Sequence, residues 1–191
     1  MPIRLGDGLG VEDYQVVRSN WQWSDHILRT YATAGMLSWL MPETVCDPAC
    51  GDGSVVIKAN ELREIGKAYL SDISAPSIAL LKLQPLRFDS EISIGPAMEN
   101  LHDVDAVVLT EILEHLEDPS ELLGAVRRHS RFLVASSPLD ERVIGGNPEH
   151  VWGWTKAEYR EMLVFNGWMP IAYQELSVRP HAYTFQLWAC Q

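Results

Sequence analysis

The sequence predicts an α/β fold built on one doubly wound, mostly parallel sheet of about seven strands. Short apolar runs alternate with helical patterns five times between residues 45 and 136. Acidic and glycine-rich segments follow the ends of these runs, which is where ligands bind in parallel sheets. Two further apolar runs near the end of the chain are expected to pair with each other as antiparallel strands.

Composition indicates a single globular domain. The chain has 191 residues, of which 47% are hydrophobic and 21% are charged. We expect an N-terminal loop or lid segment over residues 1–23 and one domain over residues 24–191. No apolar run has the length of a membrane span, and the first residues lack a signal-peptide pattern, so we expect a cytoplasmic protein.

The net charge of −11 disfavours duplex DNA or long RNA as a partner. Proteins that grip nucleic acid usually carry a basic stripe that neutralises phosphates. The only basic cluster, Arg127 to Arg131, is expected at the end of a helix, where cations suit the helix dipole. Three cysteines, Cys46, Cys50 and Cys190, lack the repeated spacing of a zinc site.

The first residues show no clear periodicity. The segment Gly6–Gly10 mimics a nucleotide-binding glycine motif, but no strand precedes it, so we expect a flexible loop. A helix is predicted over Ser24–Leu40, with Ser24 or Asp25 as its N-cap. Two interpretations remain for Trp21–His26: packing in the core, or a segment that folds over a ligand.

The strongest motif is Val45–Val56. Its apolar run ends at Asp47 and makes a tight turn through Gly51 and Gly53. The turn leads into a helix predicted over residues 54–65, which we expect to end at Gly66. Glycines without side chains let a ligand approach the backbone of such a turn closely.

A second acid follows at the end of the next strand. This strand is predicted over residues 68–74, and Asp72 lies 19 residues after Gly53. A carboxylate at this spacing can accept hydrogen bonds from the ribose hydroxyls of a nucleoside. Val56 stands where a dinucleotide fingerprint has its third glycine, which argues against NAD.

The remaining elements follow in the same alternation. Their predicted ranges are a helix at 77–83, a strand at 88–94, a turn at 95–100, a strand at 105–110, a helix at 120–129, a strand at 132–136, a long loop at 139–153, a helix at 155–165 and strands at 169–177 and 183–190. The long loop is expected to be a substrate loop or lid. The helix at 155–165 begins with a capping box formed by Thr155 and Glu158.

These motifs resemble those of class I S-adenosylmethionine (SAM) methyltransferases along nearly the whole chain from Ser24. The resemblance implies a Rossmann-like sheet and SAM as the cofactor. It implies that Asp47 holds the amino group of SAM, that Asp72 holds the ribose, and that Thr110 and Glu111 line the methyl-transfer point. The full set of cofactor-binding residues that it implies is Asp47, Cys50, Gly51, Gly53, Asp72, Ala97, Met98 and Thr110.

A second cluster follows the strand at 105–110. On one helical turn, Glu111, Glu114 and His115 would share a face, and His150 on the long loop could join them. This pattern resembles the metal-dependent methyltransferases that modify the 2′-hydroxyl at small-RNA 3′ ends. That resemblance implies a divalent metal, Mg²⁺ or Mn²⁺, held by these four residues. Alternatively, Glu111, His115 or His150 acts on the acceptor without metal.

The sequence therefore leaves three functions open. The first is SAM-dependent methyl transfer to an O or N atom of a small molecule or nucleotide. The second is metal-dependent ribose 2′-O-methylation of RNA ends, and the third is a non-catalytic SAM-fold subunit that binds a partner. The expected ligands are SAM and an unidentified methyl acceptor, with no membrane contact, and a homodimer is left open.

Overall fold

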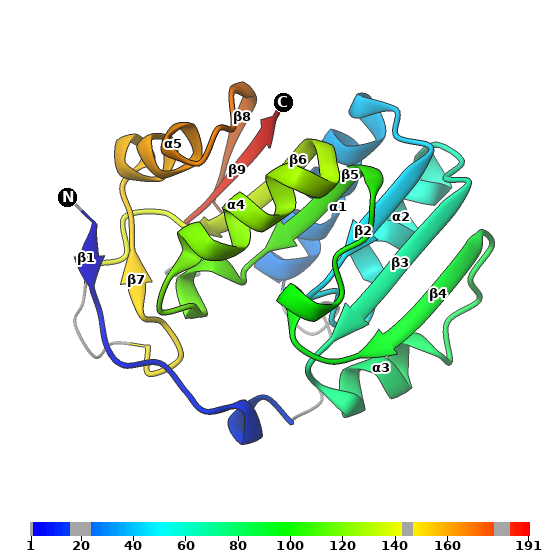
Figure 1. Ribbon diagram of the computed structural model, residues 1–191, viewed down its shortest axis with the longest axis horizontal. Helices are drawn as coiled ribbons and strands as arrows, with labels where there is room; N and C mark the ends of the chain where they lie inside the picture. The colour runs from blue at the N-terminus through cyan, green and yellow to red at the C-terminus, as the bar shows by residue number, and fades with distance from the viewer. Residues whose placement is uncertain (1, 16–23, 143–146, 178–183) are drawn as a thin grey trace.

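Seven strands form one sheet in the computed structural model (Figure 1). They are β2 (Thr44–Asp47), β3 (Lys67–Asp72), β4 (Asp89–Ile94), β5 (Val104–Thr110), β6 (Ser130–Pro138), β8 (Pro170–Ser177) and β9 (Thr184–Cys190). Their spatial order is β4-β3-β2-β5-β6-β9-β8. The neighbours from β4 to β6 are parallel, whereas β9 is antiparallel to both β6 and β8. The predicted fold class is therefore confirmed.

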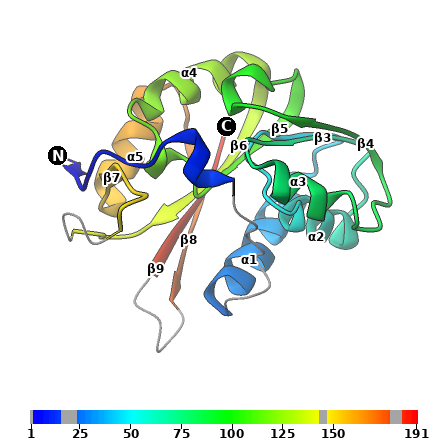
Figure 2. The same ribbon diagram turned by 90° about the horizontal axis from the view of Figure 1, so that it is seen from below.

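The structure describes residues 2–15, 24–142, 147–177 and 184–191. Helices α1 (Ser24–Leu40), α2 (Ser54–Leu62) and α3 (Ala75–Leu81) cover one face of the sheet. Helices α4 (Pro119–His129) and α5 (Lys156–Phe165) cover the other face (Figure 2). No helix in these ranges is long and apolar enough to cross a bilayer.

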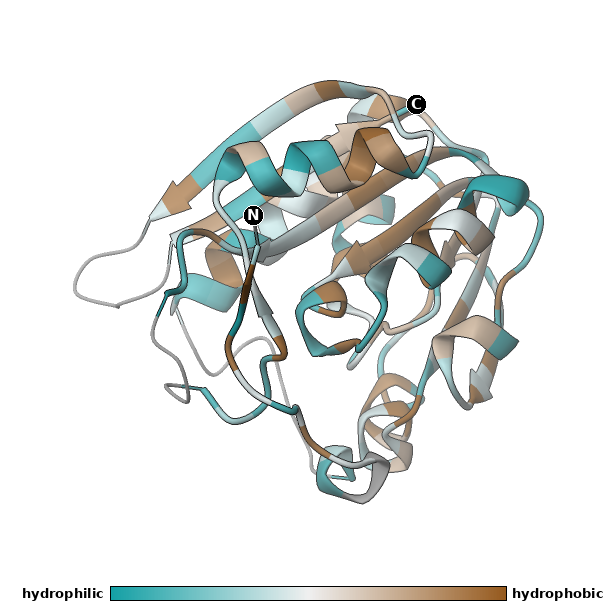
Figure 3. Ribbon diagram, turned by 60° about the vertical axis from the view of Figure 1, so that its left-hand side comes forward, coloured by the Kyte–Doolittle hydropathy of each residue, from teal (hydrophilic) through white to brown (hydrophobic). Residues whose placement is uncertain are grey.

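Each face of the sheet has its own hydrophobic core. One core joins α1, α2 and α3 to the sheet, and the other joins α4 and α5 to it. The second core contains three buried tryptophans, Trp154, Trp168 and Trp188. Hydrophobic residues concentrate along the central strands (Figure 3), as expected for parallel strands that are covered on both faces.

Helices α2 and α3 differ most from their predicted ranges. Helix α2 ends at Leu62 rather than at residue 65, because Arg63 adopts an extended conformation as its C-cap. Gly66 does not end the helix: it lies just before β3, and its amide donates to the carbonyl of Glu43, the residue before β2. Helix α3 begins earlier than predicted, because the Ser74 side chain accepts a hydrogen bond from the Ser77 amide and caps it.

The predicted N-terminal loop or lid segment, residues 1–23, contains two short elements, while Gly6–Gly10 has no helix or strand, as expected. Strand β1 (Ile3–Arg4) pairs antiparallel with β7 (Trp152–Gly153), inside the predicted long loop. Leu5 is buried, and its amide donates to the Val151 carbonyl over 2.7 Å. A 3₁₀ helix, η1 (Val11–Tyr14), follows. Of the segment Trp21–His26, residues 21–23 lie outside the described residues, and the rest begins α1.

The capping box predicted at the start of α5 is confirmed. The Thr155 hydroxyl accepts from the Glu158 amide over 3.2 Å, and the Glu158 carboxylate accepts from the Thr155 amide over 2.8 Å. We expect Thr155→Ala to lower the free energy of unfolding by about 1 kcal/mol in urea titrations, because it leaves a helix-end donor without its cap. Thr155→Ser keeps the hydroxyl and should stay near wild type; equal losses in both variants would contradict this role.

Candidate active site

The glycine turn after β2 is tied to the end of β3. The Gly51 amide donates to the Asp72 carboxylate over 2.8 Å, and the Cys50 amide donates to the Ser71 carbonyl over 2.8 Å. Gly51 and Gly53 have φ angles of 55° and 73°, a region that favours glycine. The turn is thus held in the shape that the sequence predicted, directly above the carboxyl ends of two parallel strands.

The two glycines differ in what surrounds them. A Cβ atom on Gly53 would overlap the Leu81 side chain, so this glycine makes room for helix packing. A Cβ atom on Gly51 would meet nothing within 4 Å. Gly51 instead faces a pocket of about 370 Å³, which is large enough for a small-molecule ligand.

The pocket joins the glycine turn to the residues after β5. It is lined by Leu9, Tyr14, Pro48, Ala49, Gly51, Asp72, Ile73, Ser74, Ser77, Pro96, Ala97, Glu111, Ile112, His115 and Leu116. Of the predicted cofactor residues, Gly51, Asp72 and Ala97 therefore line it, whereas Asp47, Cys50, Gly53, Met98 and Thr110 do not. Met98 is 42% exposed, and the neighbouring Pro96 takes part in the lining instead.

Asp47 is 1% exposed, and its Oδ1 atom has no hydrogen-bond partner among the described residues. Burial raises the pKa of this carboxyl to about 8, and the nearby negative charges of Asp72 and Asp52 add to the effect. The Ala49 amide and the Arg29 charge oppose the rise. The neutral acid therefore predominates below pH 8.

The thiol of Cys50 belongs to the core. It is buried beside the turn, and burial raises its pKa well above the usual range. A protonated thiol is a poor nucleophile, so Cys50 acts here as a small packing residue. All three cysteines are buried and free.

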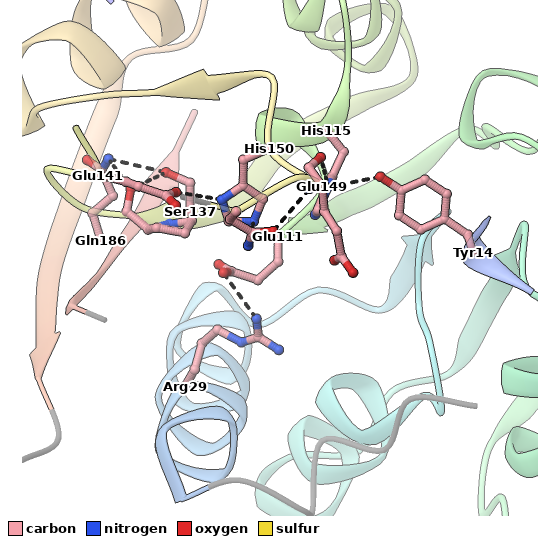
Figure 4. Close-up of polar contacts among 11 residues, drawn as sticks. Tyr14, Arg29, Glu111, His115, Ser137, Glu141, Glu149, His150 and Gln186 are labelled. Carbon is pink, nitrogen blue, oxygen red and sulfur yellow. Dashed lines mark hydrogen bonds and ion pairs between the residues drawn. The ribbon is translucent and has the colours of Figure 1, made fainter. Parts of the chain in front are cut away.

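Glu111 does not share a helical turn with Glu114 and His115. It has a φ of 54°, and the 3₁₀ helix η4 (Leu113–His115) begins only after it. Its carboxylate accepts from the Ser136 hydroxyl over 2.6 Å and lies 3.4 Å from the Arg29 guanidinium. The prediction that the three residues share one helical face is therefore wrong. Glu111 itself has the left-handed conformation, and its side chain points toward Arg29 of α1 (Figure 4).

The structure brings Glu114, His115 and His150 together. One ligand atom from each lies within 4.8 Å of the others, and the two imidazole rings are 4.9 Å apart. Glu111 is not a member of this cluster. His150 reaches it because the Val151 amide donates to the Glu114 carbonyl over 2.7 Å. Three of the four residues predicted as metal ligands thus meet.

Glu114 is 1% exposed, and neither carboxylate oxygen has a hydrogen-bond partner among the described residues. Burial raises the pKa of this carboxyl well above its usual range, and the charges of Glu111 and Glu141 reinforce the shift. Such a group without a partner is costly, so it calls for an explanation such as a bound ligand or a catalytic role.

Both histidines have their Nδ1 atom occupied. Nδ1 of His115 lies 2.8 Å from the Glu149 carbonyl and 3.1 Å from the Tyr14 hydroxyl. Because a carbonyl only accepts, Nδ1 carries the proton, and the lone pair is on Nε2. Burial and the neighbouring His150 lower the pKa of His115, which favours the neutral ring. Nδ1 of His150 lies 2.5 Å from a Glu141 carboxylate oxygen.

Sequence reasoning missed several residues of the site, chiefly Tyr14, Arg29, Ser136 and Glu141. Arg29 had a readable signal: it falls at helical spacing from the buried Thr33 and Leu37, and a charged residue on a buried face calls for a partner. Tyr14 and Glu141 had none, because their roles depend on contacts with residues far along the chain or across a loop.

Residues 46–131 match the family model described as "Methyltransferase domain". No curated protein sequence matches the chain. Among solved structures, the Synechocystis magnesium protoporphyrin IX methyltransferase with bound S-adenosylhomocysteine (SAH) aligns with a TM-score of 0.69 and 20% identity. That alignment covers 94% of this chain and 91% of the other.

Two further structures have the same fold. The 1,6-didemethyltoxoflavin-N1-methyltransferase of Burkholderia thailandensis aligns with a TM-score of 0.69 and 16% identity, covering 99% of this chain and 93% of the other. Human N-acetylserotonin methyltransferase aligns with a TM-score of 0.66 and 18% identity, covering 95% of this chain and 55% of the other. The chain therefore shares the fold of these methyltransferases, and its residues 46–131 match the methyltransferase-domain model.

Proposed function

We propose that the chain transfers a methyl group from SAM to an oxygen or nitrogen atom of a small molecule or nucleotide. The observation that carries the proposal is a single pocket lined at one side by Gly51 and Asp72 and at the other by Glu111 and His115. A cofactor bound at the glycine turn would therefore share the pocket with the groups that handle the acceptor. The named acceptors of the similar enzymes, a porphyrin, a toxoflavin precursor and an acetylated amine, are small organic molecules.

The residues of the turn fit SAM. Each oxygen of Asp72 accepts one backbone amide, from Gly51 and from Ser74, both over 2.8 Å. A carboxylate has about four lone-pair positions, so two remain for the ribose hydroxyls. Gly51 leaves space for the methionine part, and Ala97 and Pro96 would lie along the adenine. Asp47, which lacks a partner for Oδ1 among the described residues, would hold the amino group directly or through water.

Methyl transfer asks mainly for alignment, because the sulfonium of SAM already activates the methyl group. The acceptor must also lose a proton when it is a hydroxyl or a protonated amine. In this pocket, neutral His115 presents Nε2 as a proton acceptor, and its Nδ1–H is held by the Glu149 carbonyl. Glu111, fixed by Ser136 and Arg29, would orient the acceptor at the end of β5.

A second candidate adds a divalent metal to this reaction. The specific observation in its favour is the Glu114 carboxylate, which has no partner among the described residues, beside two imidazoles whose lone pairs stand on Nε2. Glu114, His115 and His150 would hold the ion, which would lower the pKa of an acceptor hydroxyl. Two imidazoles favour Mn²⁺ over Mg²⁺. The matched family model and these structures do not show the predicted similarity to the metal-dependent methyltransferases of small-RNA 3′ ends.

Binding of SAH tests the cofactor assignment. We expect Asp72→Ala to weaken SAH binding by roughly tenfold or more in titration calorimetry, because hydrogen bonds to a charged group contribute about 1.5–3 kcal/mol. Asp89→Asn is the control, since this exposed acid begins β4, at the opposite end of the parallel strands from Asp72. Unchanged affinity in Asp72→Ala would refute the placement of the ribose.

The raised pKa of Asp47 makes SAH binding depend on pH. The neutral acid must ionise to hold an ammonium group, so binding should release a proton below pH 8. We expect affinity to rise as pH increases from about 6 to about 8, and Asp47→Asn to flatten this slope. Calorimetry in buffers of different ionisation enthalpy counts the protons. Proton uptake, or an equal slope in Asp47→Asn, would contradict this role.

Metal binding separates the two candidates. If the metal-dependent candidate is correct, we expect the wild-type protein to bind Mn²⁺ in a paramagnetic resonance titration. We expect both Glu114→Gln and His150→Ala to abolish this binding. Glu111→Gln is the matched control, because its carboxylate is engaged by Ser136 and Arg29 and it should keep the ion. Methyl transfer can be followed in a labelled-SAM screen of nucleosides, RNA ends and metabolites. The metal-dependent candidate would be contradicted if the protein bound no Mn²⁺ and its methyl transfer were insensitive to EDTA.

A further inference from the structure

We propose that Glu141 is a positioning residue that fixes the tautomer and the ring orientation of His150. Its Oε2 atom lies 2.5 Å from Nδ1 of His150. The two side chains are 10% and 8% exposed, so water competes little for this contact. The inference rests on the proposed function, because it assigns His150 to the acceptor side of the site.

The backbone around Glu141 is held on both sides. The Asp140 amide donates to the Trp154 carbonyl over 2.9 Å, and Arg142 pairs with Glu158 over 2.5 Å. Gly153 allows the two segments to meet, because a Cβ atom there would overlap the Glu141 carbonyl oxygen. Glu158 also belongs to the capping box of α5, so this short segment is anchored to a helix.

The contact determines which nitrogen of His150 is protonated. A carboxylate only accepts, so Nδ1 keeps its hydrogen and the lone pair stands on Nε2. The Asn147 side-chain amide lies 3.1 Å from Nε2 and can donate to that lone pair, which agrees with this tautomer. His115 has the same arrangement, with the Glu149 carbonyl as its acceptor. Two different acceptors thus impose one tautomer on both rings.

This tautomer is the one that either form of the reaction needs. A ring that takes a proton from an acceptor, or that holds a metal ion, uses an unprotonated nitrogen, which for His150 is the Nε2 atom that the Asn147 amide reaches in this structure. An acceptor on the opposite ring nitrogen orients the ring and raises its basicity. Glu141 lies between β6 and the His150 loop, so it can act on His150 without touching the acceptor (Figure 4).

The test determines which ring nitrogen of His150 carries the proton, in protein without metal or SAM. Long-range ¹H–¹⁵N correlation spectra of wild type should show His150 protonated at Nδ1. Glu141→Ala should produce a mixture of tautomers, whereas Glu141→Gln, which keeps an oxygen acceptor, should restore the wild-type form. Asp140→Asn, an exposed neighbour on the same segment, should leave the spectrum unchanged.

Mn²⁺ binding supplies a second readout. Loss of such a supporting carboxylate typically weakens metal binding by about 10–100-fold, and we expect this of Glu141→Ala but not of Glu141→Gln. His150 protonated at Nε2 in wild type, or unchanged at Nδ1 in Glu141→Ala, would overturn the proposal. Because the tautomer is read without any ligand, this result is independent of whether SAH or Mn²⁺ binds as proposed.

Discussion

The guanidinium of Arg29 stands among the buried carboxylates at the carboxyl end of the sheet, and the site depends on it. It pairs with Glu111, and its charge lowers the pKa of both Asp47 and Glu114 against the effect of burial. Without this cation, Asp47, Glu111 and Glu114 would lose the positive charge that offsets the cost of placing acids in a poorly solvated space. Helix α1 thus contributes more than a hydrophobic face: its Arg29 supplies the positive charge that stabilises the nearby carboxylates at the carboxyl end of the sheet.

The sheet was predictable because its strands are locally encoded. Apolar runs that alternate with helical patterns indicate a parallel sheet whatever the individual residues are. The bounds of α1 follow from its helical periodicity. Two features of the fold that the sequence did not predict are of another kind. The pairing of β1 with β7 joins segments about 150 residues apart, and α2 ends where one residue, Arg63, becomes extended. Neither leaves a periodic signal.

The site divides in the same way. The turn with Gly51 and the acid Asp72 were visible in the sequence, because glycines and an acid at strand ends carry their geometry with them. The arrangement after β5 was not visible in the sequence. Glu111 itself adopts a left-handed backbone conformation, and this separates its side chain from the cluster that contains Glu114. Left-handed backbone is uncommon outside glycine, asparagine and aspartate, so no pattern rule would assign it to a glutamate.

The pairing of β1 with β7 extends the structural unit around the candidate site to the start of the chain. The segment that matches the methyltransferase family, residues 46–131, contains neither α1 with Arg29 nor the loop with His150. Removing residues 1–15 alone would take away Leu5, which bonds to Val151, and Tyr14, which meets His115. The structural unit that holds the candidate site is therefore larger than the segment that the family model matches, and residues at the start of the chain form part of its interior.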